Sequence, residues 1–165
     1  MNSTISVDVA APASLVFRLA RDVERWPRLL PHYVRVRAIE RGADGALVAE
    51  MVARRELIRV LGLGLPVAWR SRTWNEPDAL RLRFLHVGGA TNGMDVTWRI
   101  EPTDTGSRVS IDHRFSPRVP GWAPFIDRAF TRPIASRTLA TFKALAEALN
   151  DGAESADAVP ANQLS

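Results

Sequence analysis

The chain has 165 residues, of which 46% are hydrophobic and 24% charged, with a formal net charge of +4 and no cysteine. This length predicts one domain with a sizeable core. The missing cysteines exclude disulfides and thiolate metal sites and fit a reducing cytoplasm. No apolar run approaches the ~18 residues of a membrane span, and the segment MNSTISVDVAAP lacks the features of a signal peptide, so we expect a cytoplasmic protein without stable membrane insertion.

The beginning of the chain predicts a strand and two short helices. Apolar residues at positions 5, 7 and 9 alternate with polar ones, which is typical of a half-buried strand. In AAPASLVFRLAR, residues 10–21, Pro12 suits a first helical turn and the apolar residues form one side. The stretch DVERWPRLLPHYVRV, residues 22–36, leaves room for a second helix only between Pro27 and Pro31.

From residue 33 onward the apolar period changes to two, which predicts six strands joined by turns. These strands cover residues 33–41, 46–57, 66–76, 80–87, 94–102 and 107–115. Helical spacing returns after residue 122, where Pro133 should kink the helix or separate a short helix from the main one. Residues 151–165 are small and polar, and we expect them to form a disordered tail.

This order predicts an α+β fold in which residues 1–150 form a single domain with a curved antiparallel sheet of about seven strands. A sheet with one solvated face must bury the other, and only the C-terminal helix is long enough to cover it. A sheet that wraps around a helix leaves a space between them, and the function depends on whether side chains fill that space.

Strand parity identifies the inner face of the sheet. The residues that share this face in three strands are Leu80, Leu82, Phe84 and His86; Met94, Val96, Trp98 and Ile100; and Val109, Ile111, His113 and Phe115. A histidine on an apolar face is more often a hydrogen-bonded core residue than a ligand. Because histidine titrates near neutrality, both inner-face histidines are nevertheless candidates for binding or proton transfer.

The strand at 66–76 can be read in two ways. One face carries Val67, Trp69, Ser71 and Thr73, and the other carries Arg70, Arg72 and Trp74. Parity alone favours arginines on the outside because buried charges are rare. An inward guanidinium would instead suggest a polar anchor in a pocket.

The usual motifs of metal, nucleotide and nucleophile sites are missing from the sequence. The three histidines are scattered without metal-binding spacing, and GLGLP has neither dinucleotide-loop spacing nor a P-loop lysine. The arginines alternate with apolar residues along strands, as in LRLRFL, which is typical of a solvated sheet face. We therefore expect no metal, no cofactor and no nucleic acid partner.

Several strings resemble the START-type, helix-grip superfamily of polyketide cyclases/dehydrases and lipid-transport proteins. The most specific is ISVDVAAPASLVFRLARDVERWPRLLPHYVRVRAIER; WRSRTW and MDVTWRI are similar to later strands of bacterial aromatase/cyclases. The resemblance covers residues 3–149 and implies a helix-grip fold. One branch implies a pocket that folds a poly-β-ketone for aldol ring closure, and another implies a carrier of a quinone or lipid.

The resemblance also implies roles for particular residues. Arg72 matches the pocket arginine that stabilises oxyanion charge, and Trp26, Tyr33 and Trp98 match pocket aromatics. Some family members carry a further arginine on the next strand. In this sequence the nearest inward-facing residue of that strand is His86. By parity Tyr33 shares the outer face of its strand, so it reaches the pocket only if it precedes the regular strand or if a bulge turns it.

We therefore predict a pocket for a hydrophobic small molecule between the sheet and the C-terminal helix. The candidate catalytic residues are Arg72, Tyr33 and His86. The candidate ligand-binding residues are Trp26, Leu30, Met51, Trp74, Phe84, Met94, Trp98, His113, Ile134, Arg137 and Thr141. Three functions remain open: cyclisation of a polyketide, non-catalytic transport of a lipid or quinone, and protein interaction through an apolar lip at residues 26–33.

Overall fold

The computed structural model describes residues 1–58, 63–116 and 121–157. Its strands are β1 (Asn2–Val9), β2 (Tyr33–Arg41), β3 (Leu47–Ile58), β4 (Leu63–Glu76), β5 (Arg81–Gly89), β6 (Asp95–Thr103) and β7 (Gly106–Arg114). Its α-helices are α1 (Ala13–Ala20), α2 (Trp26–Leu29), α3 (Trp122–Ile126) and α4 (Arg132–Asp157). Short 3-10 turns occur at η1 (Val23–Arg25) and η3 (Pro77–Ala79), and a π-helical turn, η4 (Asp127–Thr131), joins α3 to α4.

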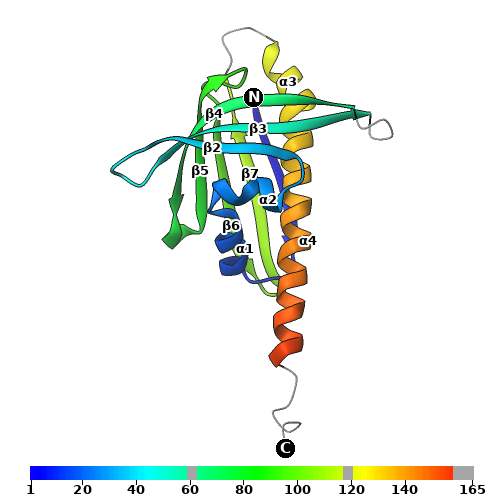
Figure 1. Ribbon diagram of the computed structural model, residues 1–165. Coiled ribbons are helices and arrows are strands. Elements are labelled where there is room, and N and C mark those ends of the chain that lie inside the picture. The colour runs from blue at the N-terminus through cyan, green and yellow to red at the C-terminus, as the bar shows by residue number, and fades with distance from the viewer. Residues whose placement is uncertain (59–62, 117–120, 158–165) are drawn as a thin grey trace, which may run out of the picture.

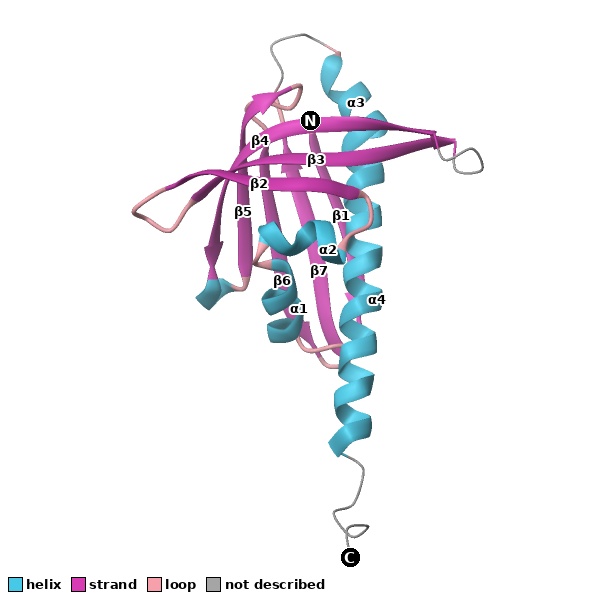
Figure 2. Cartoon of the chain, viewed as in Figure 1, coloured by secondary structure: helices cyan, strands magenta, loops and turns pink. Residues whose placement is uncertain are grey.

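The seven strands form one antiparallel sheet in the order β1-β7-β6-β5-β4-β3-β2. The sheet curves so that β2, β3 and β4 cross over the hollow, while α4 runs beside the edge strand β1 (Figure 1). Helices α1 and α2 lie in that hollow (Figure 2). The predicted α+β helix-grip fold is confirmed.

The helix boundaries follow local sequence chemistry. Pro12 precedes α1 with extended geometry, and α1 buries the apolar side that its spacing predicts. Pro133 lies in the first turn of α4, where its missing N–H costs nothing, and the π-turn separates α4 from the short helix α3. Residues 151–157 continue α4 as a helix. The predicted disordered tail is therefore wrong for these residues, and residues 158–165 lie outside the described part.

Trp26 is the centre of an aromatic core. Its ring centroid lies 5.1 Å from that of Tyr33, 5.4 Å from Trp98 and 5.9 Å from Phe142 of α4. The indole N–H donates to the Ala20 carbonyl at 2.9 Å, which ties α2 to the end of α1. The α2 segment therefore plugs one end of the space between sheet and helix.

The outer sheet face carries a ladder of ion pairs. Arg35 pairs with Glu50, Arg83 with Asp95, and Arg99 with Asp112. Every one of these arginines comes from an alternating strand segment. These arginines therefore lie on the solvated outer face, as the alternation predicts.

Candidate functional site

A cavity of about 80 Å³ lies between the inner sheet face and the first half of α4. Nine of the predicted residues line it: Trp26, Tyr33, Met51, Phe84, His86, Met94, Trp98, His113 and Ile134. No Asp, Glu, Lys or Arg is among the described residues that line this cavity. Its walls are therefore apolar apart from a few uncharged polar groups.

Tyr33 points inward because a β-bulge interrupts its strand. The pairing register of β2 with β3 shifts between Tyr33 and Arg35, so Tyr33 lies opposite Ala53 on the inner face while Arg35 and Arg37 lie on the outer face. Tyr33 is buried, and this burial raises its pKa well above the ordinary value. The phenol therefore stays protonated at every physiological pH.

Thr138 of α4 is the hydrogen-bonding partner of this phenol. Thr138 Oγ1 donates its one proton to the Ile134 carbonyl at 2.8 Å. Thr138 Oγ1 also lies 2.8 Å from His32 Nε2, and the hydrogen bond between Thr138 and the phenol partly opposes the rise in the pKa of Tyr33. The phenol therefore lies beside a polar group of α4 in the cavity wall.

His86 and His113 both line the cavity and both are held in the neutral form. Burial, together with the nearby His113, lowers the pKa of His86 to about 3. Burial also lowers the pKa of His113 to about 4, although Asp127 and Asp112 oppose the shift. The cavity thus holds two uncharged imidazoles.

The hydrogen bonds of the two rings differ. His86 Nδ1 lies 2.7 Å from Thr91 Oγ1, so Nε2 remains for a ligand. A hydrogen bond to the Ser3 backbone partly opposes the lowering of the His113 pKa. Its buried Nδ1 has no hydrogen-bond partner among the described residues.

Trp69 is a lining residue that was not selected as a site residue. Its ring stacks on His86 at 5.8 Å and meets Tyr33 edge-on at 6.0 Å. Its buried indole Nε1 has no hydrogen-bond partner among the described residues. The parity interpretation that puts Arg70 and Arg72 outside puts Trp69 on the inner face of β4, so a signal exists in the sequence.

Two predicted site residues of β4 lie outside the cavity. Arg72 and Trp74 belong to the outer face, where Arg72 pairs with Asp44 and its guanidinium lies 5.8 Å from the Trp74 ring centroid. The pocket role that the resemblance implied for Arg72 is therefore wrong, and the parity interpretation holds. Leaving the guanidinium in water avoids the cost of burying a charge.

Three further predicted residues do not line the cavity. Leu30 is completely buried beneath α2 as a core residue. Thr141 Oγ1 donates to the Arg137 carbonyl at 2.9 Å, and both residues are half-buried. Arg137 is next to the lining residue Thr138 in sequence but is not itself part of the cavity wall, and Thr141 lies about one turn beyond Thr138.

The predicted apolar lip is not available to a partner. Trp26, Leu30 and Tyr33 expose 2%, 0% and 7% of their surface. These side chains fill the core, so the hypothesis of a docking surface made from them is wrong. The outer side of the same segment carries arginines instead.

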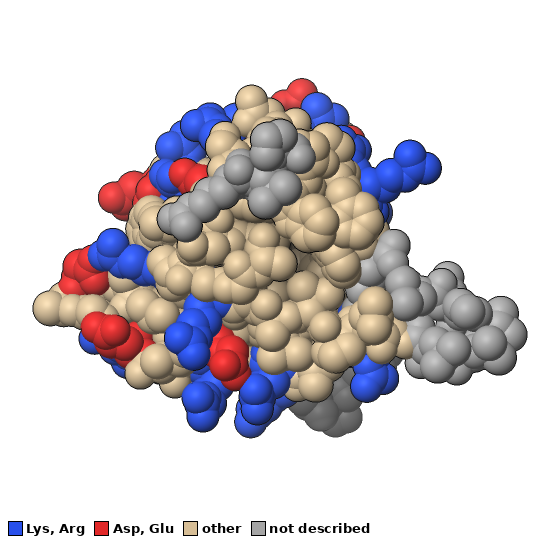
Figure 3. Space-filling model, turned by 90° about the horizontal axis from the view of Figure 1, so that it is seen from above, with Lys and Arg blue, Asp and Glu red and all other residues tan. Residues whose placement is uncertain are grey.

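The cavity is small for a site of this kind, because aromatic side chains fill most of the space. Pockets that bind drug-sized molecules usually span about 300–1,000 Å³. Seen from above, uncharged residues occupy the middle of the molecule and charged residues lie toward its margin (Figure 3). The exposed apolar residues include Leu65, Trp122 and Phe125.

Metal and membrane sites find no support in the described residues. No group of three or more His, Asp or Glu side chains in ranges 1–58, 63–116 and 121–157 could hold a metal ion. Within the same ranges, no helix is both long and apolar enough to cross a bilayer.

Comparison with known proteins gives sequence relatives that are named as polyketide cyclases. The chain is 34% identical over 142 residues to the granaticin polyketide synthase bifunctional cyclase/dehydratase of Streptomyces virginiae, a match that covers 81% of this chain and 43% of the relative. The chain therefore spans less than half the length of that relative. It is 27% identical to a putative polyketide cyclase of Streptomyces cyaneus, over 67% of this chain and 69% of the relative.

Solved structures agree with these relatives. The di-domain ARO/CYC BexL from the BE-7585A biosynthetic pathway superposes with a TM-score of 0.66 at 30% identity, over 87% of this chain and 45% of BexL. The Zhui aromatase/cyclase from Streptomyces sp. R1128 shares the fold with a TM-score of 0.73 at 21% identity, over 89% and 93% of the two chains. A model of the family described as "Polyketide cyclase / dehydrase and lipid transport" matches residues 2–147. The chain belongs to this polyketide cyclase/dehydrase and lipid transport family.

Proposed function

We propose that the protein binds a poly-β-carbonyl chain in the cavity and promotes its aldol ring closure. The observation that carries this proposal is an apolar cavity that holds uncharged proton-transfer groups, Tyr33 and His86, and no charged side chain among its described lining residues. The sequence relatives, a polyketide synthase cyclase/dehydratase and a putative polyketide cyclase, support the same reaction class.

The reaction needs one proton acceptor and one proton donor. His86 Nε2 accepts the proton of a carbon that lies between two ketones, and the resulting enolate carbon forms a bond to a second carbonyl carbon. The alkoxide formed there takes the proton of Tyr33, which turns its O–H from Thr138 toward the ligand. The product is a cyclic β-hydroxy ketone; the imidazolium then reprotonates the phenolate, and later loss of water yields an unsaturated ring.

The unpaired ring nitrogens fit the same ligand class. The Trp69 indole N–H and His113 Nδ1 have no hydrogen-bond partner in the described part of the chain. A chain of alternating ketone and enol groups supplies both an oxygen acceptor and an O–H donor. Buried groups left without partners each cost about 1–3 kcal/mol, so a ligand that satisfies them gains that amount.

A chain of several ketide units is larger than the present cavity, so binding must enlarge it. Phe130 and Ile134, which lie on the helical side of the cavity, are only half-buried. We expect the aromatic rings on this side to rotate outward when the ligand enters. A ligand-bound crystal structure would show this directly.

Turnover of a synthetic linear poly-β-ketone thioester tests the proposal. Appearance of the cyclised product is followed by mass spectrometry and absorbance. His86→Gln should lower kcat by about 10²–10⁴-fold, and Tyr33→Phe, which removes one oxygen, should lower it by a similar factor. Thr141→Val is the control, since Thr141 does not line the cavity. Full turnover in His86→Gln would exclude the proposed proton acceptor.

The second candidate is a carrier that binds a lipid or quinone without changing it. The described lining residues include no charged side chain, which favours a carrier because an apolar chain requires no charged anchor. Native mass spectrometry of the purified protein distinguishes the two. A co-purified acyl or polyprenyl chain, together with no turnover of the synthetic substrate, would establish the carrier.

A further inference from the structure

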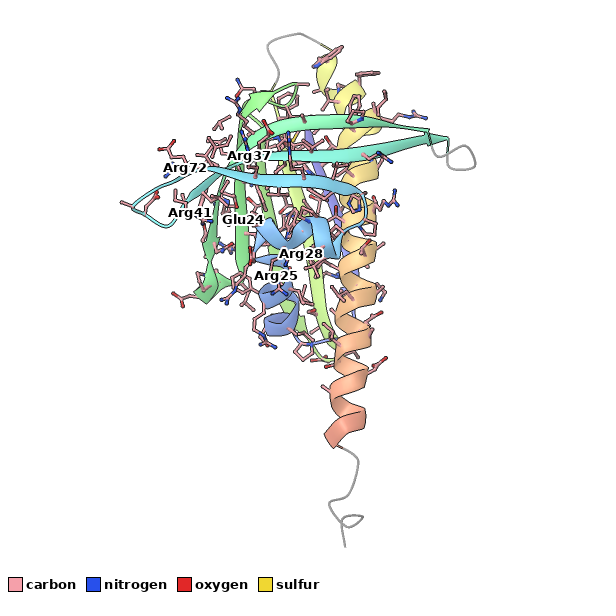
Figure 4. The ribbon with its side chains drawn as sticks, viewed as in Figure 1. Glu24, Arg25, Arg28, Arg37, Arg41 and Arg72 are labelled. Atoms are coloured by element: carbon pink, nitrogen blue, oxygen red, sulfur yellow. The ribbon has the colours of Figure 1, made fainter. Side chains whose placement is uncertain are left out.

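The outer side of residues 23–41 carries arginines that the fold does not use. Arg25, Arg28, Arg37 and Arg41, which we call the arginine patch, come from η1, α2 and β2 and lie on one face of the molecule (Figure 4). Both α2 and η1 contact β2, so the three elements form a continuous surface. The inner side of the same segment forms the core around Trp26.

The charges of this patch are largely unneutralised. All four arginines are exposed, and only Arg41 has a carboxylate partner, Glu24, at 2.5 Å. Arg25, Arg28 and Arg37 make no ion pair with any carboxylate in the described ranges of the chain. Glu50, the cross-strand neighbour of Arg37, is bonded to Arg35.

We propose that the arginine patch docks an acidic protein surface, such as a helix that presents a row of Asp and Glu side chains. Each guanidinium offers a planar fork that binds a carboxylate through two parallel bonds. The strand and the adjacent helix fix the backbone positions from which these side chains extend. The inference stands on charge and placement and does not depend on the proposed function of the cavity.

The composition of the patch favours a protein over a nucleic acid or a membrane. Glu24 lies within it with 38% of its side chain exposed, and it would repel the phosphates of nucleic acids or lipids. A partner protein can match that carboxylate with a cation, which also fixes the docking register. The exposed apolar residues of β2, Val34 and Ile39, supply the apolar contacts that arginine-rich protein interfaces contain.

The binding experiment uses the whole chain and a defined acidic probe. The probe is a fluorescent alanine-based helical peptide of about 20 residues with a row of Glu side chains, and its counterpart carries Gln at those positions. The Glu peptide should bind saturably and weaken as ionic strength rises from about 0.05 to about 0.2 M. The Gln peptide should bind at least about tenfold more weakly.

Charge reversal then locates the site. Arg28→Glu with Arg37→Glu should weaken binding at least about tenfold. The matched pair, Arg114→Glu with Arg128→Glu, changes the net charge equally at exposed sites elsewhere and should weaken it less than about twofold. Circular dichroism checks that both variants are folded. A Lys peptide should bind the first variant and not the unmodified protein.

Three results would overturn the proposal. One is the absence of saturable binding of the Glu peptide. Another is an equal loss in the two charge-reversed pairs, which would show attraction to net charge alone. The third is tighter binding, through Arg28 and Arg37, of a DNA duplex of about 20 base pairs or of vesicles with about 30% phosphatidylserine.

Discussion

At the scale of single residues, His86 and His113 determine what the cavity can do. A neutral imidazole can accept a proton or a hydrogen bond, and burial keeps both rings neutral at pH 7. The same burial makes the fold sensitive to acid. Protonation of either ring would place a charge in a cavity whose walls are mostly apolar.

We predict that stability falls as the pH drops from 6.5 toward 4. The pKa of His113 is lowered to about 4 in the fold and returns to about 6.5 on unfolding, so the unfolded state binds more protons in this window. The full contribution is present above pH 6.5, and His113 alone accounts for a loss on the order of 3 kcal/mol. Urea denaturation across this range measures it.

The contribution of His113 to this pH dependence can be tested by replacing it, and its charged neighbours are known. Asp127 and Asp112 raise its pKa, and Arg132, which bonds to Asp127, lowers it. Because His86 also titrates in this window, His113→Gln should reduce the pH slope of the unfolding free energy between about 6.5 and about 5 by about half. An unchanged slope would show that His113 is not the group responsible.

Arg72, unlike the two histidines that line the cavity, lies outside the site. Because it pairs with exposed Asp44 on the outer face, Arg72→Ala should cost less than about 1 kcal/mol of unfolding free energy. Turnover of the synthetic poly-β-ketone should remain within about twofold of the unmodified protein. A hundredfold loss would restore the oxyanion role that the resemblance implied.

At the scale of elements, the β6–β7 hairpin meets the end of β1 at a position that requires glycine. Gly106 has φ of 142°, and a Cβ there would lie 2.2 Å from the Val9 carbonyl oxygen and 2.8 Å from the Ala11 amide. Strand β1 and the start of α1 therefore depend on this close approach.

Gly106→Ala should lower the free energy of unfolding by at least about 2 kcal/mol, because strain and a backbone clash act together. Gly45→Ala is the matched control. Gly45 also has a positive φ, 77°, but no atom lies within 4 Å of its Cβ position. Gly45→Ala should lower the free energy of unfolding by only about 1 kcal/mol. Equal losses in the two variants, measured by thermal and urea unfolding, would contradict the clash.

The sequence predicted the elements better than it predicted the site. Element order and inner-face parity follow from hydrophobic period, and this period placed Phe84, Met94, Trp98 and His113 correctly. Tyr33 depends on a bulge, which adds one residue without a composition signal, so parity alone placed it outside. The resemblance placed Arg72 in the pocket. This was wrong because a guanidinium in solvent avoids the free-energy cost of burying a charge, as strand parity indicates.

At the scale of the whole molecule, the domain ends where α4 stops contacting the sheet. Ala146 is the last fully buried residue described, and residues 151–153 are exposed although helical. We therefore propose that residues 1–150 form the complete folding unit. The helix beyond them buries no apolar surface in its described part.

A shortened chain of residues 1–150 should unfold in one cooperative transition, with a midpoint within a few degrees of the full chain. Differential scanning calorimetry measures both quantities. Two transitions, or a drop of more than about 8 °C, would show that the C-terminal residues contribute to the core.

The β-bulge in β2 and the π-helical turn before α4 have a shared consequence for how the cavity arose. The β-bulge beside Tyr33 and the π-turn Asp127–Thr131 each hold one residue more than a regular strand or helix needs. Tyr33, Phe130 and Thr131, which line the cavity, lie at these two places. A lineage could therefore gain or lose the polar side of this cavity by inserting or deleting one codon, while the sheet and the long helix stay unchanged.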